Sequence, residues 1–193
     1  MGREFELKYR CERESFEAVK AAFGEFTPIS METTYYDTFD GKLGNAHWTL
    51  RRRLENGKSV CTLKTPDSDG GQGEWEVEAK GIMAGIPKLC QLGAPIQLMV
   101  LTVNGVGPVC GAKFTRLAKL LEIPGGRVEL ALDEGVLLGG GKEMPLLEVE
   151  VELKEGSDQA AMAFAAELAG TYGLLPENKS KYRRALGLAR GEK

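Results

Sequence analysis

The sequence predicts an α+β fold, mainly antiparallel β, built as a closed eight-stranded barrel with covering helices. Three stretches, 4–10, 74–80 and 148–154, alternate charged and apolar residues. Because successive side chains of a strand point to opposite faces, each stretch would have one ionic face and one apolar face. The pair Asn56-Gly57 accepts the positive φ angles of a tight turn and predicts a hairpin. Hairpin-connected strands of this kind lose their exposed edges when the sheet closes.

The other elements follow from turn residues and helical spacing. The stretch 13–23 has apolar residues on one side and ends at Gly24, which predicts a covering helix. Strands are expected at 4–10, 31–39, 48–55, 58–65, 74–80, 127–133 and 146–154, with a long strand from 109 to the turn at 124–126. Further helices are expected at 158–172, at about 180–188, and as two short pieces in the weakly patterned stretch 82–108, the second near 96–103.

Length and composition favour a single domain over residues 1–193. The 42% of hydrophobic residues is enough for a core, and a net charge of -3 with a pI near 5.4 argues against a nucleic-acid-binding surface. No apolar run reaches the ~18 residues of a membrane span, and the chain starts with a charged strand in place of a signal peptide. We therefore expect a cytoplasmic protein with no membrane partner. The four cysteines lack CxxC spacing, which indicates reduced thiols without a zinc site.

The ionic faces of the predicted strands would converge on the lumen of the barrel. That lumen would hold acids and bases together: Glu4, Glu6, Glu74, Glu76, Glu148 and Glu150 with Lys8, Arg51, Arg53 and Lys64. Unpaired buried charge costs more than folding supplies, so the lumen needs a charged guest of both signs. A metal cation bound to a polyphosphate is the simplest such guest.

Several motifs occur in an order that resembles a known family. They are Glu4-Phe5-Glu6-Leu7-Lys8, Tyr35-Tyr36-Asp37-Thr38, Leu50-Arg51-Arg52-Arg53, Thr62-Leu63-Lys64, Glu74-Trp75-Glu76, Thr115-Arg116, Leu132-Asp133-Glu134-Gly135, Leu147-Glu148-Val149-Glu150-Val151-Glu152 and Lys179-Ser180-Lys181-Tyr182. On these residues the chain resembles the CYTH domain proteins, also called triphosphate tunnel metalloenzymes. The first motif matches the family signature ExExK, and the others extend the likeness over nearly the whole chain.

The resemblance implies a tunnel that binds a triphosphate with Mg²⁺ or Mn²⁺ as the cofactor. Metal ligands would be Glu4, Glu6, Asp133, Glu148 and Glu150, with Glu74 and Glu76 placing a second ion. Phosphate oxygens would be held by Lys8, Arg51, Arg53, Lys64, Arg116 and Lys181. Hard divalent cations take oxygen ligands and Arg suits phosphate geometry, so the residue types agree with these roles. One departure is Gln72, where the family often has Arg, and it leaves the length of the substrate open.

The activity expected from the resemblance is hydrolysis of inorganic triphosphate to pyrophosphate and phosphate, with Tyr35 and Lys64 as the catalytic pair. Alternatives are a thiamine triphosphatase, a class IV adenylyl cyclase, or a polyphosphate-binding module without turnover. An organic group needs an apolar surface to stack on, and strand phase points Phe5 and Trp75 away from the lumen. This favours the inorganic substrate. A homodimer stays open as an assembly.

Four positions near the predicted lumen also have plainer interpretations. Tyr35 fits the core as well as it fits catalysis. Arg52 has the opposite strand phase to its neighbours and is expected to pack against a helix. Lys179 and Arg184 are expected to belong to a basic, solvated final helix.

Overall fold

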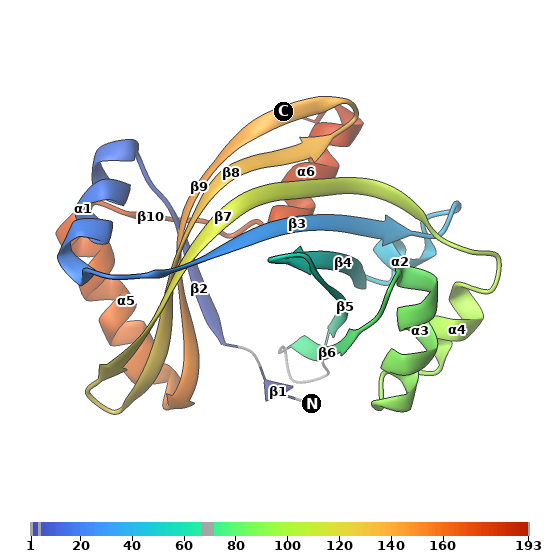
Figure 1. Cartoon of the computed structure of the whole chain (residues 1–193), viewed down its shortest axis with the longest axis horizontal. Helices are drawn as coiled ribbons and strands as arrows, with labels where there is room; N and C mark the ends of the chain where they lie inside the picture. Colours follow the sequence, from blue (N-terminus) through green and yellow to red (C-terminus); the bar gives the residue numbers. More distant parts are fainter. Residues whose placement is uncertain (1, 4, 67–71, 193) are drawn as a thin grey trace.

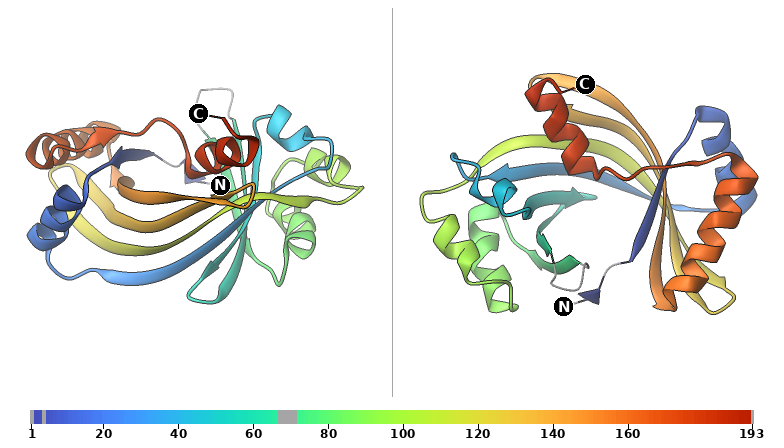
Figure 2. Two further views of the ribbon diagram at one scale, coloured as in Figure 1. Left: turned by 90° about the horizontal axis from the view of Figure 1, so that it is seen from above. Right: turned by 180° about the vertical axis from the view of Figure 1, so that it is seen from behind.

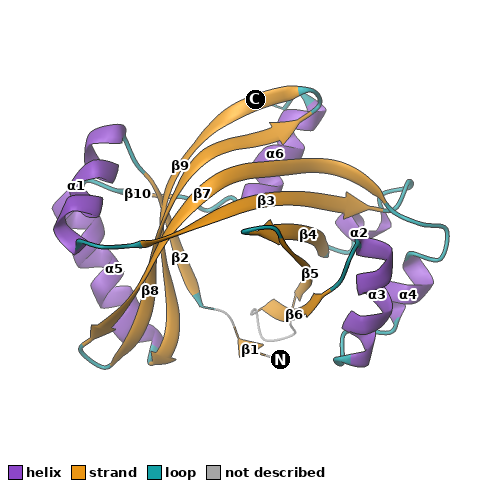
Figure 3. Cartoon of the chain, viewed as in Figure 1, coloured by secondary structure: helices purple, strands orange, loops and turns teal. Residues whose placement is uncertain are grey.

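The computed structural model describes residues 2–3, 5–66 and 72–192. These residues form an antiparallel sheet flanked by helices (Figures 1 and 3). The strands are β1 (Gly2–Arg3), β2 (Glu6–Arg10), β3 (Thr27–Asp37), β4 (Thr49–Glu55), β5 (Lys58–Pro66), β6 (Gln72–Glu78), β7 (Gly107–Ile123), β8 (Gly126–Gly139), β9 (Lys142–Gly156) and β10 (Leu175–Pro176). The helices are α1 (Arg13–Phe23), α2 (Lys42–Asn45), α3 (Ile82–Gln91), α4 (Gln97–Leu101), α5 (Asp158–Tyr172) and α6 (Lys181–Arg190).

The sheet has the strand order β1-β6-β5-β4-β3-β7-β8-β9-β2-β10. Although β1 and β2 are consecutive in the chain, β1 pairs with β6 and β2 pairs with β9. Among the described residues no ladder joins the two ends of this order, so the predicted closed eight-stranded barrel is not confirmed. The reason is that the N-terminal segment is divided between the two ends of the sheet: β1 pairs with β6 at one end, and β2 pairs with β9 at the other. To close the sheet, one strand would have to form hydrogen bonds along both of its edges with these two neighbours.

Three hairpins position the long strands. Asn56 and Gly57 have φ angles of 49° and 85°, as the predicted tight turn between β4 and β5 requires. Gly125, with φ of 85°, turns β7 into β8, and the Gly140-Gly141 pair turns β8 into β9. The resulting strands β7, β8 and β9 have 17, 14 and 15 residues and form an arch (Figure 1).

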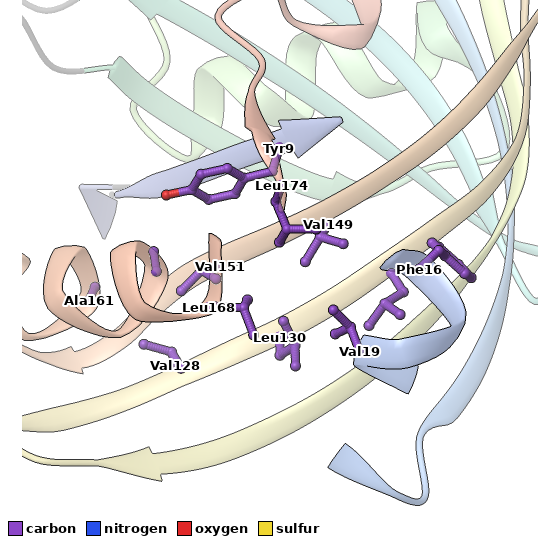
Figure 4. Close-up of a cluster of buried hydrophobic side chains, with 12 residues drawn as sticks. Tyr9, Phe16, Val19, Val128, Leu130, Val149, Val151, Ala161, Leu168 and Leu174 are labelled. Atoms are coloured by element: carbon purple, nitrogen blue, oxygen red, sulfur yellow. The ribbon is translucent and has the colours of Figure 1, made fainter. Parts of the chain in front are cut away.

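Helices α1 and α5 cover the outer face of this arch. Figure 4 shows their shared core, in which Phe16 and Val19 of α1 and Leu168 of α5 meet Leu130 and Val149 of the strands. The alanines of α5 allow a close approach to the sheet, as predicted, and Ala161 and Ala165 are fully buried. The predicted bounds of both helices, 13–23 and 158–172, are confirmed. Burial of this apolar face, more than helix propensity, stabilises the two helices.

Helices α3 and α4 cover the outer face of the β4–β6 hairpins. Their core contains Leu50, Leu63, Leu89 and Leu98, all essentially without exposure. Gly85 lets α3 lie against β5, because a Cβ atom at that position would be only 2.7 Å from the side chain of Cys61. The two helical pieces predicted in 82–108 are thus both present, at the end of the molecule opposite α1 and α5 (Figure 1).

Helix α6 packs on the inner face of the arch. It lies against β7, β8 and β9 (Figure 2), with Ala185 buried among Leu137, Leu146 and Ala112. Its first residue, Lys181, follows the N-cap Ser180, whose side chain accepts a hydrogen bond from the backbone N–H of Arg183. Helix α6 therefore covers part of the inner face of the sheet. Lys181, at the start of the helix, lies at the border of the part that α6 leaves uncovered.

Candidate active site

The inner face of the sheet lines a cavity of about 850 Å³. Among its lining residues are Glu6, Lys8, Tyr35, Arg51, Arg53, Lys64, Glu74, Glu76, Arg116, Glu150 and Lys181, all predicted site residues. Their neighbours in the chain point the other way, so that Leu50 and Leu63 lie in the core under α3. The alternation read from the sequence therefore placed these charges on one surface, although the sheet is not closed by hydrogen bonds.

Two of the predicted metal ligands, among the described residues, do not line this cavity. Asp133 and Glu148 have no exposure and lie behind the cavity wall. Glu4 lies outside the described residues, so its predicted role stays a prediction. Glu148 and Asp133 are adjacent across the β8–β9 ladder, and both lie in a buried layer of charged side chains that contacts the start of α6.

Lys181 lies at the centre of that layer. Its Nζ atom is 2.8 Å from Asp133 Oδ2, 2.5 Å from Glu148 Oε2 and 2.5 Å from Glu150 Oε1. An ammonium group with three donors matches three carboxylates in one small space. Burial alone would lower the pKa of Lys181, but Asp133, Glu150 and Glu148 outweigh it and raise that pKa above its ordinary value. Lys181 is therefore a fixed positive charge.

Arg116 is the second cation of the same layer. Its Nε and Nη2 atoms donate to the two oxygens of Asp133 at 2.8 and 2.7 Å, and Nη2 also donates to Glu150. The Phe114 ring lies under both cations, with its centroid 5.9 Å from the Arg116 guanidinium carbon and 5.4 Å from Lys181 Nζ. This network holds the two cations in one geometry.

The two carboxylates of β9 respond to this layer in opposite ways. Burial raises the pKa of Glu148 above its ordinary value despite the attraction of Lys181. Burial would also raise the pKa of Glu150, but Lys181 and Arg116 prevail and hold that pKa below its ordinary value. Glu150, which reaches the cavity, is thus firmly anionic at neutral pH.

A looser set of charges lies across the cavity on β4, β5 and β6. Arg51 Nη2 is 3.6 Å from Glu74 Oε1, and Lys64 Nζ is 3.5 Å from Glu74 Oε2. Strand register puts Arg51 beside Thr62 and Thr62 beside Glu76, and the Thr62 hydroxyl donates to Glu76 at 3.2 Å. These separations exceed those around Lys181 by about an ångström. Glu74 therefore contacts both a β4 cation and a β5 cation on the cavity surface.

Arg53 and Arg52 illustrate the two faces of β4. Arg53 lines the cavity and donates to Glu55 of its own strand from Nε at 2.7 Å. Burial and the nearby Arg51 lower the pKa of Arg53. Arg52 points outward, as predicted, and donates to the Ser59 hydroxyl at 2.8 Å across the hairpin. The contact of Arg52 is thus with a neighbouring strand.

A row of three carboxylates crosses the cavity wall formed by β2, β9 and β8. Glu6 is the ladder partner of Glu152, and Glu152 is the ladder partner of Glu129. All three line the cavity, and the predicted site did not contain Glu152 or Glu129. Lys8 Nζ lies 3.0 Å from Glu6, and Lys154 Nζ lies 2.7 Å from Glu152. Like charges that face each other across strands are destabilising, so this row favours a bound cation.

A comparison with known families decides what kind of protein has this site. The CYTH domain profile matches residues 2–186. The chain belongs to the CYTH domain family. The predicted resemblance is thereby confirmed.

Individual relatives of this CYTH domain agree with the assignment. The inorganic triphosphatase of Haemophilus influenzae is 28% identical over 162 residues, which cover 83% of this chain and 46% of that protein. The chain thus spans about half the length of this curated relative. A putative adenylyl cyclase from Hippeastrum, described as having a dominant triphosphatase activity, is 18% identical with a TM-score of 0.69, covering 100% of this chain and 97% of that one. The PH1819 protein of Pyrococcus horikoshii is 26% identical with a TM-score of 0.63, covering 97% and 99%.

Two groups of carboxylates in this CYTH domain have donors that suit a divalent cation. Asp133, Glu148 and Glu150 each offer one oxygen within 4.8 Å of the others. Lys181 Nζ contacts all three carboxylates, so the protein itself supplies a positive charge to this group. The row that contains Glu6 and the accessible side of Glu150 are open to the cavity. Oxygen donors of this type fit Mg²⁺ or Mn²⁺.

The aromatic residues near the CYTH cavity agree in part with the prediction. Phe5 packs against the core covered by α1 and α5, and Trp75 packs against the core covered by α3 and α4, so both side chains face outward as strand phase predicted. Phe114, Met31 and Ile29 add an apolar wall. Tyr35 is buried, as its core interpretation predicted, and it also reaches the cavity, where its ring centroid is 5.1 Å from that of Tyr182.

Finally, no helix in the described part of this CYTH chain is long and apolar enough to cross a membrane.

Proposed function

We propose that this CYTH domain hydrolyses inorganic triphosphate to pyrophosphate and phosphate with the help of a divalent cation. The observation that supports this proposal is one cavity of about 850 Å³ in which cations on β4 and β5 face a carboxylate row on β2 and β9. A metal-bound triphosphate needs both signs of charge within one space. The 28% identity to an inorganic triphosphatase adds support.

The phosphate oxygens are assigned first to Arg51 and Lys64. Both line the cavity and lie 3.5 to 3.6 Å from Glu74, so an anionic substrate would compete with that carboxylate for them. Arg53 lies two residues along the same strand face, and Lys8 lines the opposite wall. Arginine and lysine together give bidentate and point-charge contacts to a chain of phosphates.

Arg116 and Lys181 are assigned a different role. Each is neutralised by carboxylates at 2.5 to 2.8 Å, so binding phosphate as their main partner would leave buried acids uncompensated. They form a fixed, positively charged part of the cavity wall, next to which a terminal phosphate binds. Charges that are preorganised in this way stabilise the transition state of phosphoryl transfer without further rearrangement.

The metal would be held by Glu6 and Glu150, with Glu152 and Glu129 beside them. When bound, a divalent cation neutralises phosphate charge and lowers the pKa of a coordinated water. Glu74 and Glu76, on the opposite wall, are the predicted positions for a second ion. Asp133 and Glu148 serve Lys181 in this proposal, which revises their predicted role as direct ligands.

Tyr35 acts in this proposal as a hydrogen-bond donor. Burial raises the pKa of its hydroxyl above the ordinary value, so the group is protonated at neutral pH. A protonated phenol can donate to a bridging or terminal phosphate oxygen and stabilise the negative charge that develops there. Lys64, on a neighbouring strand face of the same cavity, supplies the positive charge of the predicted pair.

One observation supports an organic triphosphate as a second candidate. Ile29, Met31 and Phe114 line the cavity, and an apolar wall is what a base or a thiamine ring would contact. Met31 and Phe114 are 4% and 7% exposed, so most of their surface is already buried in the core. We therefore rank thiamine triphosphate and ATP, including cyclisation of ATP, below the inorganic substrate.

The test is phosphate release from triphosphate, ATP and thiamine triphosphate, each with Mg²⁺, with Mn²⁺ and with EDTA. We expect metal-dependent turnover that is fastest for inorganic triphosphate and is lost in Glu6→Gln. The matched control is Glu167→Gln, on α5, which should keep full activity. Turnover in EDTA would contradict the metal site, and triphosphate binding without turnover would indicate a non-catalytic binding module.

A further inference from the structure

Exposed apolar side chains gather at one end of the molecule. Among the described residues, ten large hydrophobic side chains are exposed, and seven of them lie at or next to α3 and α4: Phe39, Met83, Leu92, Ile96, Met99, Val100 and Val103. Isolated exposed apolar residues are normal on a protein surface, but a group of this kind marks an interaction site.

Four of the seven form one face of α4 and its flanks. Ile96, Met99, Val100 and Val103 are spaced i, i+3, i+4 and i+7 and are 61%, 44%, 69% and 76% exposed. This is the spacing of residues that share one side of a helix. The opposite side is the buried one, since Leu98 has no exposure and Thr102 has 2%. The helix therefore presents apolar residues both to the core and to its outer surface.

This outer face, defined by Ile96, Met99, Val100 and Val103, is extended by Phe39 and Leu92. Leu92 follows α3 directly, and the Phe39 ring lies where a Cβ atom on Gly107 would be only 3.3 Å from it. Gly107 starts β7, and the Phe39 ring is also 3.9 Å from a Cβ atom placed on Gly105, so Phe39 lies beside the loop that joins α4 to β7. We name these six residues the α4 patch.

The α4 patch lies in a stretch without charge. From residue 89 to residue 112 the sequence has no Asp, Glu, Lys or Arg, although charged residues make up 27% of the chain. A surface of this composition offers nothing to a charged partner and creates no repulsion with a second copy of itself. Charge depletion with Met and Phe enrichment is typical of the centre of an interface.

We infer that the α4 patch is the interface of a homodimer, in which α4 packs against α4 of a second copy around a two-fold axis. Six side chains with roughly 100 Å² each give about 600 Å² per copy, and two such surfaces exceed the ~1,000 Å² that a specific interface requires. A two-fold interface is self-complementary, which an uncharged apolar surface satisfies without matched ion pairs.

The proposed dimer leaves the cavity open. Helices α3 and α4 cover the outer face of β5 and β6, whereas Lys64 and Glu74 point from the inner face into the cavity. Substrate therefore has access in both the single chain and the dimer. The inference does not depend on the proposed function, and the two can fail separately.

The experiment measures molar mass by sedimentation equilibrium and light scattering over a wide range of protein concentration. We expect the full chain to approach twice its 21.0 kDa mass. Met99→Glu should raise the dimer dissociation constant at least tenfold, and Val100→Glu with Val103→Glu should leave a monomer. Glutamate at these exposed positions costs the single chain little, and circular dichroism checks that each variant is folded.

The matched control is Met162→Glu. Met162 is 53% exposed on α5, at the other end of the molecule (Figures 1 and 2), so the same substitution removes a similar exposed side chain outside the α4 patch. The control should dimerise like the unchanged chain. A monomeric unchanged chain at the highest concentration would overturn the inference, and so would a dimer that Met99→Glu and Met162→Glu affect equally.

Discussion

Arg184 Nη2 lies 2.5 Å from Oε1 of Glu148, and the other oxygen of that fully buried carboxylate lies 2.5 Å from Lys181 Nζ. Glu148 therefore holds two cations of the same helix, one turn apart. Only Lys181 reaches the cavity. The position of a cavity cation is thus fixed through a buried acid by Arg184, a residue that was expected to be solvated.

Removing Arg184 should cost far more than its place on a basic helix suggests. We expect Arg184→Ala to lower the free energy of unfolding by about 3–5 kcal/mol, because it leaves a buried carboxylate with one cation fewer. Arg183→Ala, at the exposed neighbouring position, should change it by less than about 0.5 kcal/mol. Urea unfolding of both variants measures the difference, and equal effects would contradict the role of the Glu148 contact.

Glu150 should give the fold a defined dependence on pH. Burial would raise its pKa, but Lys181 and Arg116 hold that pKa below the ordinary value. A carboxylate with a lowered folded-state pKa contributes stability that is fully present above the unfolded-state pKa of about 4.3 and is lost as the pH falls through the folded-state pKa. We therefore expect Glu150→Gln to be less stable than the unchanged chain at pH 7 and to lose less stability on acidification.

The measurement is the urea midpoint of both proteins from pH 7 down to pH 3. The difference between the two urea midpoints should become smaller as the pH falls below about 4.3. The pKa of Glu148 is shifted in the opposite direction, because burial raises it, but Glu148 is present in both proteins and its effect on their difference cancels. A gap that stays constant across this range would show that Glu150 is not held in its charged form by Lys181.

Strand phase is the part of the site that the sequence predicted well. Side-chain alternation is a local property of extended chain, so Arg51 and Arg53 could be placed opposite Arg52 without knowledge of the fold. The same reasoning placed Glu74 and Glu76 with them. It also directed Phe5 and Trp75 outward, where they pack against the two cores that the helices cover.

Strand register and depth could not be predicted in this way. Glu129 joins the carboxylate row only because β8 pairs with β9 in a register that sets it opposite Glu152. The burial of Glu148 depends on α6, which packs over it. Arg184 of α6 donates a hydrogen bond to Glu148, and the two residues are 36 positions apart in the sequence. The unpredicted helix α2 has four residues and depends on a side chain outside it, since the Asp37 carboxylate accepts hydrogen bonds from the backbone N–H groups of Leu43 and Gly44.

The two faces of β4 give a test of the proposed phosphate contacts. Arg51→Ala should raise KM for triphosphate about tenfold or more, because it removes a charged hydrogen-bonding partner of the substrate. Arg52→Ala, on the outer face, should leave both kinetic constants unchanged. Steady-state kinetics on the two variants decides it, and similar losses in both would contradict the assignment of the inner face.

The last prediction concerns Tyr35, whose hydroxyl is proposed to act in the chemical step. If a protonated Tyr35 donates to a phosphate oxygen as charge develops, Tyr35→Phe should lower kcat for triphosphate by roughly 10²-fold while changing KM little. Burial raises the pKa of Tyr35 above its ordinary value, so its ionisation should not shape the rate between pH 6 and pH 9. The pH profiles of the two proteins should therefore be parallel there.

Tyr172→Phe provides the control, because Tyr172, the last residue of α5, packs against the core that α1 and α5 cover and does not line the cavity. It should retain full kcat. An increase in KM without a loss of kcat in Tyr35→Phe would mean that Tyr35 binds the ground state only, since a group that acts in the transition state must change kcat. In that case the Tyr35 ring, packed at 5.1 Å from Tyr182, would be a wall of the cavity and Lys64 would act without it.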